Sequence, residues 1–338
     1  MTRTSLSQFT SAPLSILFLL ASGCAQREPV LKQLDRELRG LALALAPAIV
    51  ELQTQPDSGA PVIVGSALAI GNDGQLLTTA SVLKSGKPLL ARLPGGKRAP
   101  VALLGTDWET NLALLKLEGE RISHTIPLVG PSDIAIGQLG FLAGTAPMMH
   151  GPAVMFGTMA HTTLGGDDPY NYPLYALNTV SLLARPGAPV FDASGALLGM
   201  VDGKMHDAAT GNWTVIPLPT IRVILPMLER GGGVPRGFLG ILPASGCDEV
   251  NGDGIVVGEV LAGSPANAMG LQRGDIVSEI NSVRTTRLVT LRKNVTAKPD
   301  GAVTIRLLRR NRIITVSGTL GSHVTTANDE LKQTLRKL

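Results

Sequence analysis

The first chemistry to test for is nucleophilic hydrolysis. It needs a nucleophile and a base that takes its proton, usually a serine or cysteine with a histidine close to it. The histidines of the chain are His124, His150, His161, His206 and His323. None of them stands at a spacing from a serine, such as Ser181 or Ser194, that indicates a nucleophile–base pair. The segment from Met1 to Arg121 holds no histidine at all. Residue types alone therefore do not indicate a hydrolytic site.

Ligands for a metal ion or a phosphate group are the next chemistry to test for. The acidic residues that cluster in the sequence are Asp167, Asp168, Asp248, Glu249 and Asp253. Their spacing does not fit a calcium-binding EF-hand loop, so we interpret them as turn residues. The two cysteines form no Cys/His cluster for zinc. The glycine run at residues 231–233 lacks the lysine of a phosphate-binding loop. We therefore expect no metal ion and no cofactor.

The elements that would position any site are expected to be short strands. The 338 residues include 39 glycines and 23 prolines, only 17% are charged, and short apolar runs alternate with turn residues. This pattern is typical of a mainly β protein, and the length indicates two or three domains. The formal net charge is only +4. The arginines at residues 306–312 flank alternating apolar residues, so we expect a solvated strand face and no nucleic-acid partner.

The first 24 residues have the features of an export signal. Arg3 supplies positive charge, and the apolar core at residues 14–21 is far shorter than a membrane-spanning helix. The run Ala21-Ser22-Gly23-Cys24 resembles the lipobox of bacterial lipoproteins, although Ala21 stands where leucine is usual. The resemblance implies that Cys24 becomes a lipidated first residue, which would tether an extracytoplasmic protein to a membrane. An outer-membrane destination is compatible with Ala25, because no acidic retention signal follows the cysteine.

The rest of the chain divides by its periodicity. Leucines recur at helical spacing from Leu31 onward and predict an amphipathic helix, to about Ala44, within the linker at residues 25–45. Strands in the following part, residues 46–130, are expected at Ala48–Leu52, Val62–Ile70, Leu76–Thr79, Leu89–Leu93, Val101–Leu104 and Leu112–Leu117. Strands in residues 135–230 are expected at Gln138–Ala143, Val154–Ala160, Leu174–Thr179, Pro189–Asp192, Leu197–Val201 and Trp213–Ile216. A closing helix is expected at Leu218–Glu229, with Thr220 as its N-cap and the glycines at 231–233 as its end.

Three blocks in residues 46–230 resemble the HtrA (Deg) type of trypsin-like serine protease. These blocks are Gly65-Ser66-Ala67 with Leu77-Thr78-Thr79-Ala80-Ser81-Val82, Asp107-Trp108-Glu109-Thr110-Asn111-Leu112, and Ala184-Arg185-Pro186-Gly187-Ala188-Pro189. The resemblance implies a trypsin-like double β-barrel, with barrels at 46–130 and 135–230. It also implies that the triad positions of histidine, aspartate and serine are held by Ser81, Asn111 and Pro186.

These three residues predict a degenerate catalytic site. Pro186 has no hydroxyl to attack with, and proline has no backbone N–H to give to an oxyanion hole. Ala184 stands where the resemblance expects the glycine before Asn-Ser. Loss of one member of a triad already costs several powers of ten in rate. We therefore interpret the barrels as a protease scaffold without catalytic residues.

A different motif begins at Arg236. The run Gly270-Leu271-Gln272-Arg273-Gly274-Asp275-Ile276, with Ile280-Asn281 behind it, resembles the PDZ domain of HtrA-type proteins. The resemblance covers residues 236–320, so that an α+β domain is expected after the barrels. Residues 321–338 read as a polar tail. Leu288, Leu291 and Val295 stand at the spacing of a helix beside the peptide groove.

The PDZ resemblance implies a site for peptide C-termini, which add as a strand to a sheet edge while loop amides hold the carboxylate. The N–H groups of Leu239, Gly240 and Ile241 are the expected donors, since a glycine permits close backbone approach. The side chains expected to line the apolar pocket are Phe238, Ile241, Leu291 and Val295. Arg236 is expected to assist electrostatically.

The sequence therefore predicts a non-catalytic, HtrA-like lipoprotein that binds peptide or unfolded-protein C-termini. It would act as a scaffold, adaptor or chaperone-like factor in envelope protein quality control. The resemblance implies assembly as a homotrimer or together with an active HtrA-type protease. The alternative is a divergent HtrA-family serine endopeptidase, and a purely structural surface lipoprotein is a third class.

Overall fold

A computed structural model describes residues 30–56, 59–71, 73–145, 152–161, 174–179, 185–207, 212–244 and 254–326. The chain divides into two compact units, residues 1–41 and 42–338. The residues singled out above that lie outside the described parts are Arg3, Ala21, Ser22, Gly23, Cys24, Ala25, His150, Asp167, Asp168, Ser181, Ala184, Asp248, Glu249 and Asp253. None of the described helices is both long and apolar enough to cross a membrane.

Helix α1 (Val30–Leu45) forms where the leucine spacing predicts a helix. Its polar side carries pairs at i,i+4 spacing, which support a helix by a few tenths of a kcal/mol each. Gln33 Nε2 donates to Glu37 Oε1 at 3.0 Å, and Arg39 Nε lies 3.1 Å from Asp35 Oδ2. A short 3-10 helix, η1 (Ala46–Ala48), leads into the first strand.

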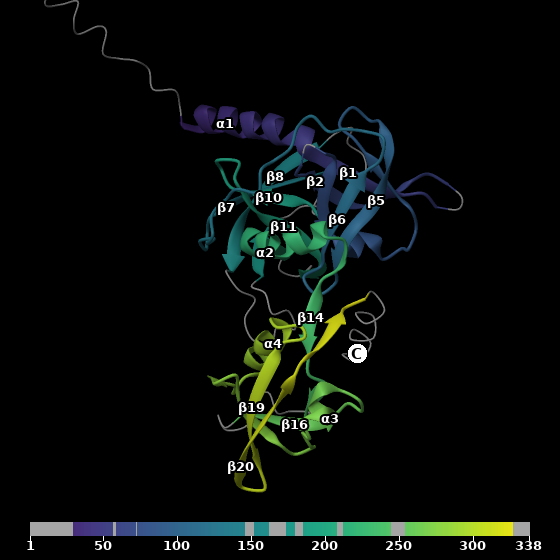
Figure 1. Cartoon of the computed structure of the whole chain (residues 1–338). Coiled ribbons are helices and arrows are strands. Elements are labelled where there is room, and N and C mark those ends of the chain that lie inside the picture. The colour runs from purple at the N-terminus through teal and green to yellow at the C-terminus, as the bar shows by residue number, and fades with distance from the viewer. Residues whose placement is uncertain are drawn as a thin grey trace, which may run out of the picture. The chain divides into compact units, whose positions relative to one another are not determined.

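Six antiparallel strands form the first barrel, shown in blue in Figure 1. They are β1 (Ile49–Thr54), β2 (Val62–Ala69), β3 (Gln75–Thr79), β4 (Leu89–Arg92), β5 (Arg98–Asp107) and β6 (Leu112–Leu117). Their order is β4-β1-β2-β3-β6-β5, and β4 also pairs with β5, which closes the sheet. Leu52, Leu68, Leu77 and Leu114 are fully buried, so leucines fill the interior in place of the scarce aromatic residues.

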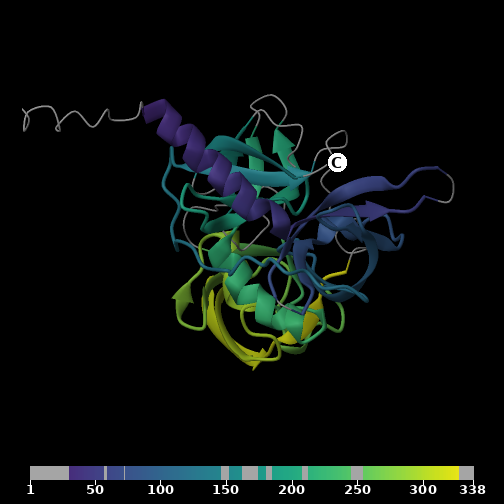
Figure 2. The same cartoon turned by 90° about the horizontal axis from the view of Figure 1, so that it is seen from above.

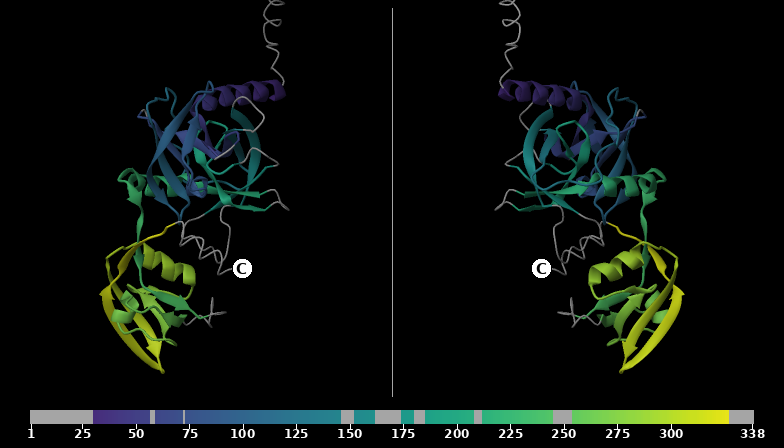
Figure 3. Two further views of the ribbon diagram at one scale, coloured as in Figure 1. Left: turned by 90° about the vertical axis from the view of Figure 1, so that its right-hand side faces the viewer. Right: turned by 90° about the vertical axis from the view of Figure 1, so that its left-hand side faces the viewer.

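The second barrel is also closed, in the order β10-β11-β12-β9-β8-β7. Its strands are β7 (Leu139–Thr145), β8 (Pro152–His161), β9 (Tyr175–Asn178), β10 (Pro189–Phe191), β11 (Leu197–Asp207) and β12 (Asn212–Pro217). The two barrels, blue and teal, lie side by side in Figures 2 and 3. Helix α2 (Leu218–Glu229) packs against β5 and β6 of the first barrel and β11 and β12 of the second.

The start of α2 differs from the expectation. Its N-cap is Pro217, which makes no side-chain cap, and Thr220 lies inside the first turn at 4% exposure. The expected cap at Thr220 is therefore wrong. The reason is that β12 runs directly into the helix, and Pro219 in the first turn has a φ that already suits a helix.

A mixed α+β domain follows the barrels. Its sheet has the order β15-β16-β17-β19-β20, with β18 beside β17. The strands are β15 (Ile241–Pro243), β16 (Ile255–Val260), β17 (Ile276–Ile280), β18 (Val283–Arg284), β19 (Ala302–Arg309) and β20 (Arg312–Thr319), and the helices are α3 (Pro265–Ala268) and α4 (Leu288–Thr296). Leu291 and Val295 of α4 belong to the same buried cluster as Val303, Ile305 and Leu307 of β19. Figure 3 shows α4 along one side of this curved sheet.

Three short strands join this domain to the chain around it. The glycine run at residues 231–233, expected as the end of α2, contains β13 (Gly232–Gly233), which pairs in parallel with β5. Strand β14 (Pro235–Phe238) pairs with β21 (Gly321–Val324). Residues 321–324 therefore form a strand, where the sequence indicated the start of a tail, because backbone pairing with β14 needs no particular side chains. The predicted fold class, a trypsin-like double β-barrel followed by an α+β PDZ domain, is confirmed.

Candidate functional site

The structure brings Ser81 and Asn111 together at one end of the first barrel. Ser81 lies in the 3-10 helix η2 (Ala80–Leu83), directly after β3, and Asn111 directly precedes β6. Because β3 and β6 are antiparallel partners with Thr79 opposite Leu112, the two segments must meet. The Ser81 N–H donates to Asn111 Oδ1 at 2.8 Å, and Asn111 Nδ2 lies 3.4 Å from Ser81 Oγ.

A third residue, Asp202 on β11, completes this group from the second barrel. Asn111 Nδ2 donates to Asp202 Oδ1 at 2.7 Å and to the Asp202 carbonyl at 2.6 Å. Ser81 Oγ donates to the same carbonyl at 3.4 Å. Asn111 and Asp202 are 1% and 3% exposed. The only ionisable member of the group is thus Asp202, which the sequence reasoning missed because its partner lies 91 positions away on another barrel.

Asn111 suits this position in two ways. Its φ is +58°, in the left-handed region that asparagine tolerates better than most residues. Its amide group is a neutral donor, whereas a carboxylate at the same place would face the Asp202 carboxylate without a proton between them.

Pro186 lies against the strand that carries Asp202. A Cβ atom added to Gly203 would come within 2.5 Å of Pro186 Cγ, so the proline ring occupies the space beside β11. The Pro186 carbonyl accepts from the Ser66 N–H at 2.9 Å, and the next amide, of Gly187, donates to the Val201 carbonyl at 3.0 Å. The loop is therefore held by β2 and β11.

These contacts define what the site can do chemically. A serine hydroxyl and an asparagine amide do not take up a proton near neutral pH, so neither acts as a general base. Pro186 supplies neither an attacking oxygen nor an oxyanion donor. Ser81 and Asn111 meet through hydrogen bonds, while Pro186 lies against Gly203, the residue after Asp202.

The other residues considered for chemistry have local contacts where they are described. Ser123 Oγ and His124 Nδ1 lie 3.3 Å apart on the surface. Ser194 Oγ donates to Asp192 Oδ1 at 2.6 Å within a turn. The His323 ring lies 6.2 Å from the Phe238 ring. Among the described residues, no group of three His, Cys, Asp or Glu side chains is placed to hold a metal ion.

The residues expected to bind a peptide carboxylate lie on one loop between β14 and β15. Gly240 has φ +86°, and a Cβ atom there would overlap Ser264, so only glycine fits. The carbonyls of Leu239 and Gly240 accept from Ala266 and Leu261, each at 2.9 Å. Within the described parts of the chain, the N–H groups of Leu239 and Gly240 donate to no backbone carbonyl. This loop thus retains donors for a carboxylate.

The side chains of the expected peptide pocket differ in their burial. Leu239, Leu291 and Val295 are 3%, 5% and 7% exposed and share the domain core, whereas Phe238 and Ile241 are half-buried. Leu291 and Val295 are available to a ligand only at the edge of that core.

Arg236 is not brought to the carboxylate loop. Its guanidinium pairs with Asp107, and its Nε lies 2.5 Å from Glu109 Oε2. Both carboxylates belong to the first barrel, and Asp107 also accepts from Thr110 Oγ1 at 2.5 Å. Arg236 therefore joins the linker to the turn that carries Asn111, and its electrostatic role toward a peptide is not supported by this geometry.

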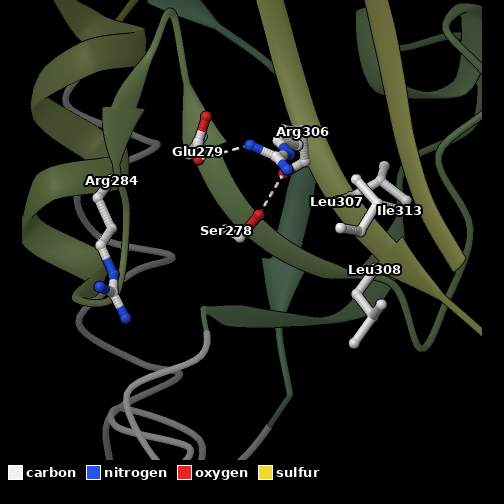
Figure 4. A pocket seen from close by; sticks show the side chains of 7 residues that line it. All are labelled: Ser278, Glu279, Arg284, Arg306, Leu307, Leu308 and Ile313. Atoms are coloured by element: carbon white, nitrogen blue, oxygen red, sulfur yellow. Dashed lines mark hydrogen bonds and ion pairs between the residues drawn. The ribbon is translucent and has the colours of Figure 1, made fainter. Parts of the chain in front are cut away.

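A hollow of about 260 Å³ lies on the sheet of the α+β domain, away from that loop. Figure 4 shows its lining residues, with Arg306 beside Glu279 and Ser278. Arg306 Nη1 lies 3.2 Å from Glu279 Oε1, and Ser278 Oγ donates to the Arg306 carbonyl at 3.1 Å. Arg306 is thus already paired.

The fold is that of a trypsin-like double β-barrel followed by an α+β PDZ domain. Residues 65–200 match the family model of the trypsin-like peptidase domain, and residues 228–308 match that of the PDZ domain.

The relatives are HtrA-type serine endoproteases. Serine endoprotease DegS of Haemophilus influenzae is 24% identical over 289 residues, 80% of this chain and 83% of DegS. A probable periplasmic serine endoprotease, DegP-like, of Marinomonas sp. is 29% identical over 244 residues, 68% of this chain. The chain spans only 50% of that protein. The structure of the HtrA-type protease AlgW with a decapeptide has the same fold, with a TM-score of 0.72 at 22% identity over 85% of this chain and 99% of AlgW.

Proposed function

We propose that this protein is a non-catalytic, HtrA-like, extracytoplasmic lipoprotein that binds the C-termini of peptides or unfolded envelope proteins through its PDZ domain. It would serve as a scaffold, adaptor or chaperone-like factor. The observation that carries the proposal is that Ser81 and Asn111, at the positions where the resemblance implies a histidine base and its aspartate, are hydrogen-bonded to each other and to Asp202. Pro186, at the implied position of the nucleophile, has no hydroxyl.

Peptide binding is the activity that this chain retains in the proposal. The N–H groups of Leu239 and Gly240 support it, because they lack backbone partners among the described residues. The AlgW structure contains a decapeptide, and the DegP-like relative is described as periplasmic. We carry both properties over to this chain as part of the proposal.

The decisive experiment combines a cleavage assay with a binding assay. The purified protein is incubated with unfolded casein and titrated with a library of peptides that differ in their last residues. We expect no cleavage, and binding that disappears when the peptide carboxylate is amidated.

The competing function is that of a divergent serine endopeptidase, which the names of the relatives favour. Casein cleavage that co-purifies with the protein, together with covalent labelling by a serine-directed fluorophosphonate, would overturn the proposal. A surface lipoprotein with a purely structural role would bind neither the free nor the amidated peptides.

Lipidation at Cys24 and assembly are separate parts of the proposal. Metabolic labelling with a fatty-acid analogue should mark the wild-type protein and not Cys24→Ala; labelling that survives the substitution would remove the lipoprotein claim.

Sedimentation of the purified protein, alone and with an active HtrA-type protease, tests for a homotrimer and for a mixed assembly.

A further inference from the structure

An apolar groove lies between helix α2 and the end of helix α4. Its volume is about 570 Å³, within the roughly 300–1,000 Å³ typical of small-molecule sites. Val223 and Met227 of α2 line it, and they are 58% and 38% exposed. Ala297 and Pro299, just after α4, and Pro235 of β14 also line it. Exposed apolar side chains that line one groove indicate a ligand with an apolar body.

The charges at this groove are positive. Arg230 and Lys293 line it, and both are exposed. In the part of the chain that the structure describes, neither side chain has an ionic or hydrogen-bond partner. Arg236 also lines the groove, but it is paired with Asp107 and Glu109. No carboxylate lines the groove among the described residues, so a ligand there would carry its own negative charge.

The backbone around the groove distinguishes between two kinds of anionic ligand. The lining residues of α2 and α4 have helical backbone, whose hydrogen bonds are internal. Strand β13 has only two residues and pairs with β5, and β14 pairs with β21, so each of these strands has one unpaired edge among the described residues. Of the strand residues that line the groove, Pro235 has no N–H, so an extended peptide, which must satisfy its own N–H and C=O groups, finds few backbone partners there. An acyl chain has no such groups to satisfy.

We propose that this groove binds an anionic single-chain amphiphile of the long-chain fatty acid class. Its acyl chain lies against Val223, Met227 and Pro299, and its carboxylate is bound by Arg230 and Lys293. Charge-assisted hydrogen bonds to these two cations supply the polar part of recognition. The proposal is independent of peptide binding by the loop at Leu239 and Gly240.

The test measures palmitate binding to the full chain by isothermal titration, below the concentration at which palmitate self-associates. We expect saturable binding of about one palmitate per chain, and weaker binding of hexadecanol, which has the same chain without the charge. Arg230→Glu with Lys293→Glu should weaken palmitate binding by about tenfold, a loss of about 1.4 kcal/mol, because two exposed cations that attract the carboxylate become carboxylates that repel it.

A matched pair of substitutions controls for net charge. Arg98→Glu with Arg121→Glu changes two exposed arginines outside the groove and should leave palmitate binding unchanged. Val223→Glu, at an exposed position, should weaken binding without unfolding the protein. A photoactivatable palmitate analogue should label peptides of α2 and of residues 293–299.

Three results would overturn the proposal. The first is no saturable palmitate binding. The second is that Arg98→Glu with Arg121→Glu weakens palmitate binding as much as Arg230→Glu with Lys293→Glu does. The third is displacement of bound palmitate by an acidic peptide that itself binds tighter, which would assign the groove to a peptide.

Discussion

The contact between Asn111 and Asp202 excludes two ionised carboxylates at these positions. Both are almost completely buried, and the Asn111 amide donates to the Asp202 carboxylate at 2.7 Å. Two carboxylates at this separation cannot both stay ionised, since burial strengthens their repulsion. The aspartate that the protease resemblance expects at position 111 is therefore incompatible with an ionised Asp202.

Asn111→Asp should lower the free energy of unfolding by about 3 kcal/mol at neutral pH, because it sets a second buried carboxylate against that of Asp202. The loss should become smaller as the pH falls, since a protonated carboxyl group again donates a hydrogen to its neighbour. Urea unfolding at pH 7 and pH 5 measures both effects.

The double variant Asn111→Asp with Asp202→Asn exchanges the two groups and serves as the control. It restores one amide and one carboxylate, so it should recover most of the lost stability. An Asn111→Asp protein as stable as the wild type at pH 7 would show that the two side chains are not in contact.

At the scale of single residues, the spacing of residues in the sequence predicted some parts of the site and missed others. The positions of Ser81 and Asn111 follow from a sequence block and from two adjacent strands, so the sequence predicts their meeting. Asp202 is held by a contact between different barrels, and in the sequence it is only an aspartate after the buried run of β11. No periodicity indicates a partner 91 positions away.

The loop before β10 and the strand β11 fit together through a glycine. Gly203 has φ +72°, and its missing side chain leaves room for the Pro186 ring. Gly119 has nearly the same φ, +70°, but nothing lies within 4 Å of an added Cβ atom. The two glycines thus separate the cost of the backbone conformation from the cost of overlap.

Gly119→Ala should cost about 1 kcal/mol, the penalty for an L-residue in the left-handed region. Gly203→Ala should cost about 3 kcal/mol, because overpacking against Pro186 adds to that penalty. Unfolding in urea gives both values. Pro186→Ala in the Gly203→Ala background should recover part of the difference, and equal costs for the two glycine substitutions would mean that Pro186 does not lie against β11.

At the scale of elements, the apolar pattern predicted most strands and the bounds of α2, because burial on one face or both leaves a period in the sequence. The elements that it missed are held by backbone pairing. Strands β13 and β21 are short and half exposed, and they form because β5 and β14 offer them hydrogen-bond partners. The expected cap at Thr220 is wrong for a related reason, since β12 already fixes where α2 begins.

At the scale of the whole molecule, the linker between the barrels and the PDZ domain is fixed by Arg236. The sequence placed this arginine next to the carboxylate loop and indicated an electrostatic role there. In the structure its side chain is directed toward Asp107 and Glu109 of the first barrel. Neighbours in sequence on a strand point to opposite sides, so proximity to the loop at Leu239 did not determine where the guanidinium lies.

Arg236→Met should lower the free energy of unfolding by about 3 kcal/mol, because Asp107 is 2% exposed and loses its cationic partner. Arg306→Ala is the control: it breaks the exposed pair with Glu279 and should cost less than about 1 kcal/mol. Adding Asp107→Asn to Arg236→Met removes the stranded charge and should restore part of the stability. Since Asp107 belongs to the turn that carries Asn111, amide hydrogen exchange in that turn should speed up in Arg236→Met and not in Arg306→Ala. Equal stability losses in the two single variants, with unchanged exchange, would mean that the buried pair does not hold the linker to the barrel.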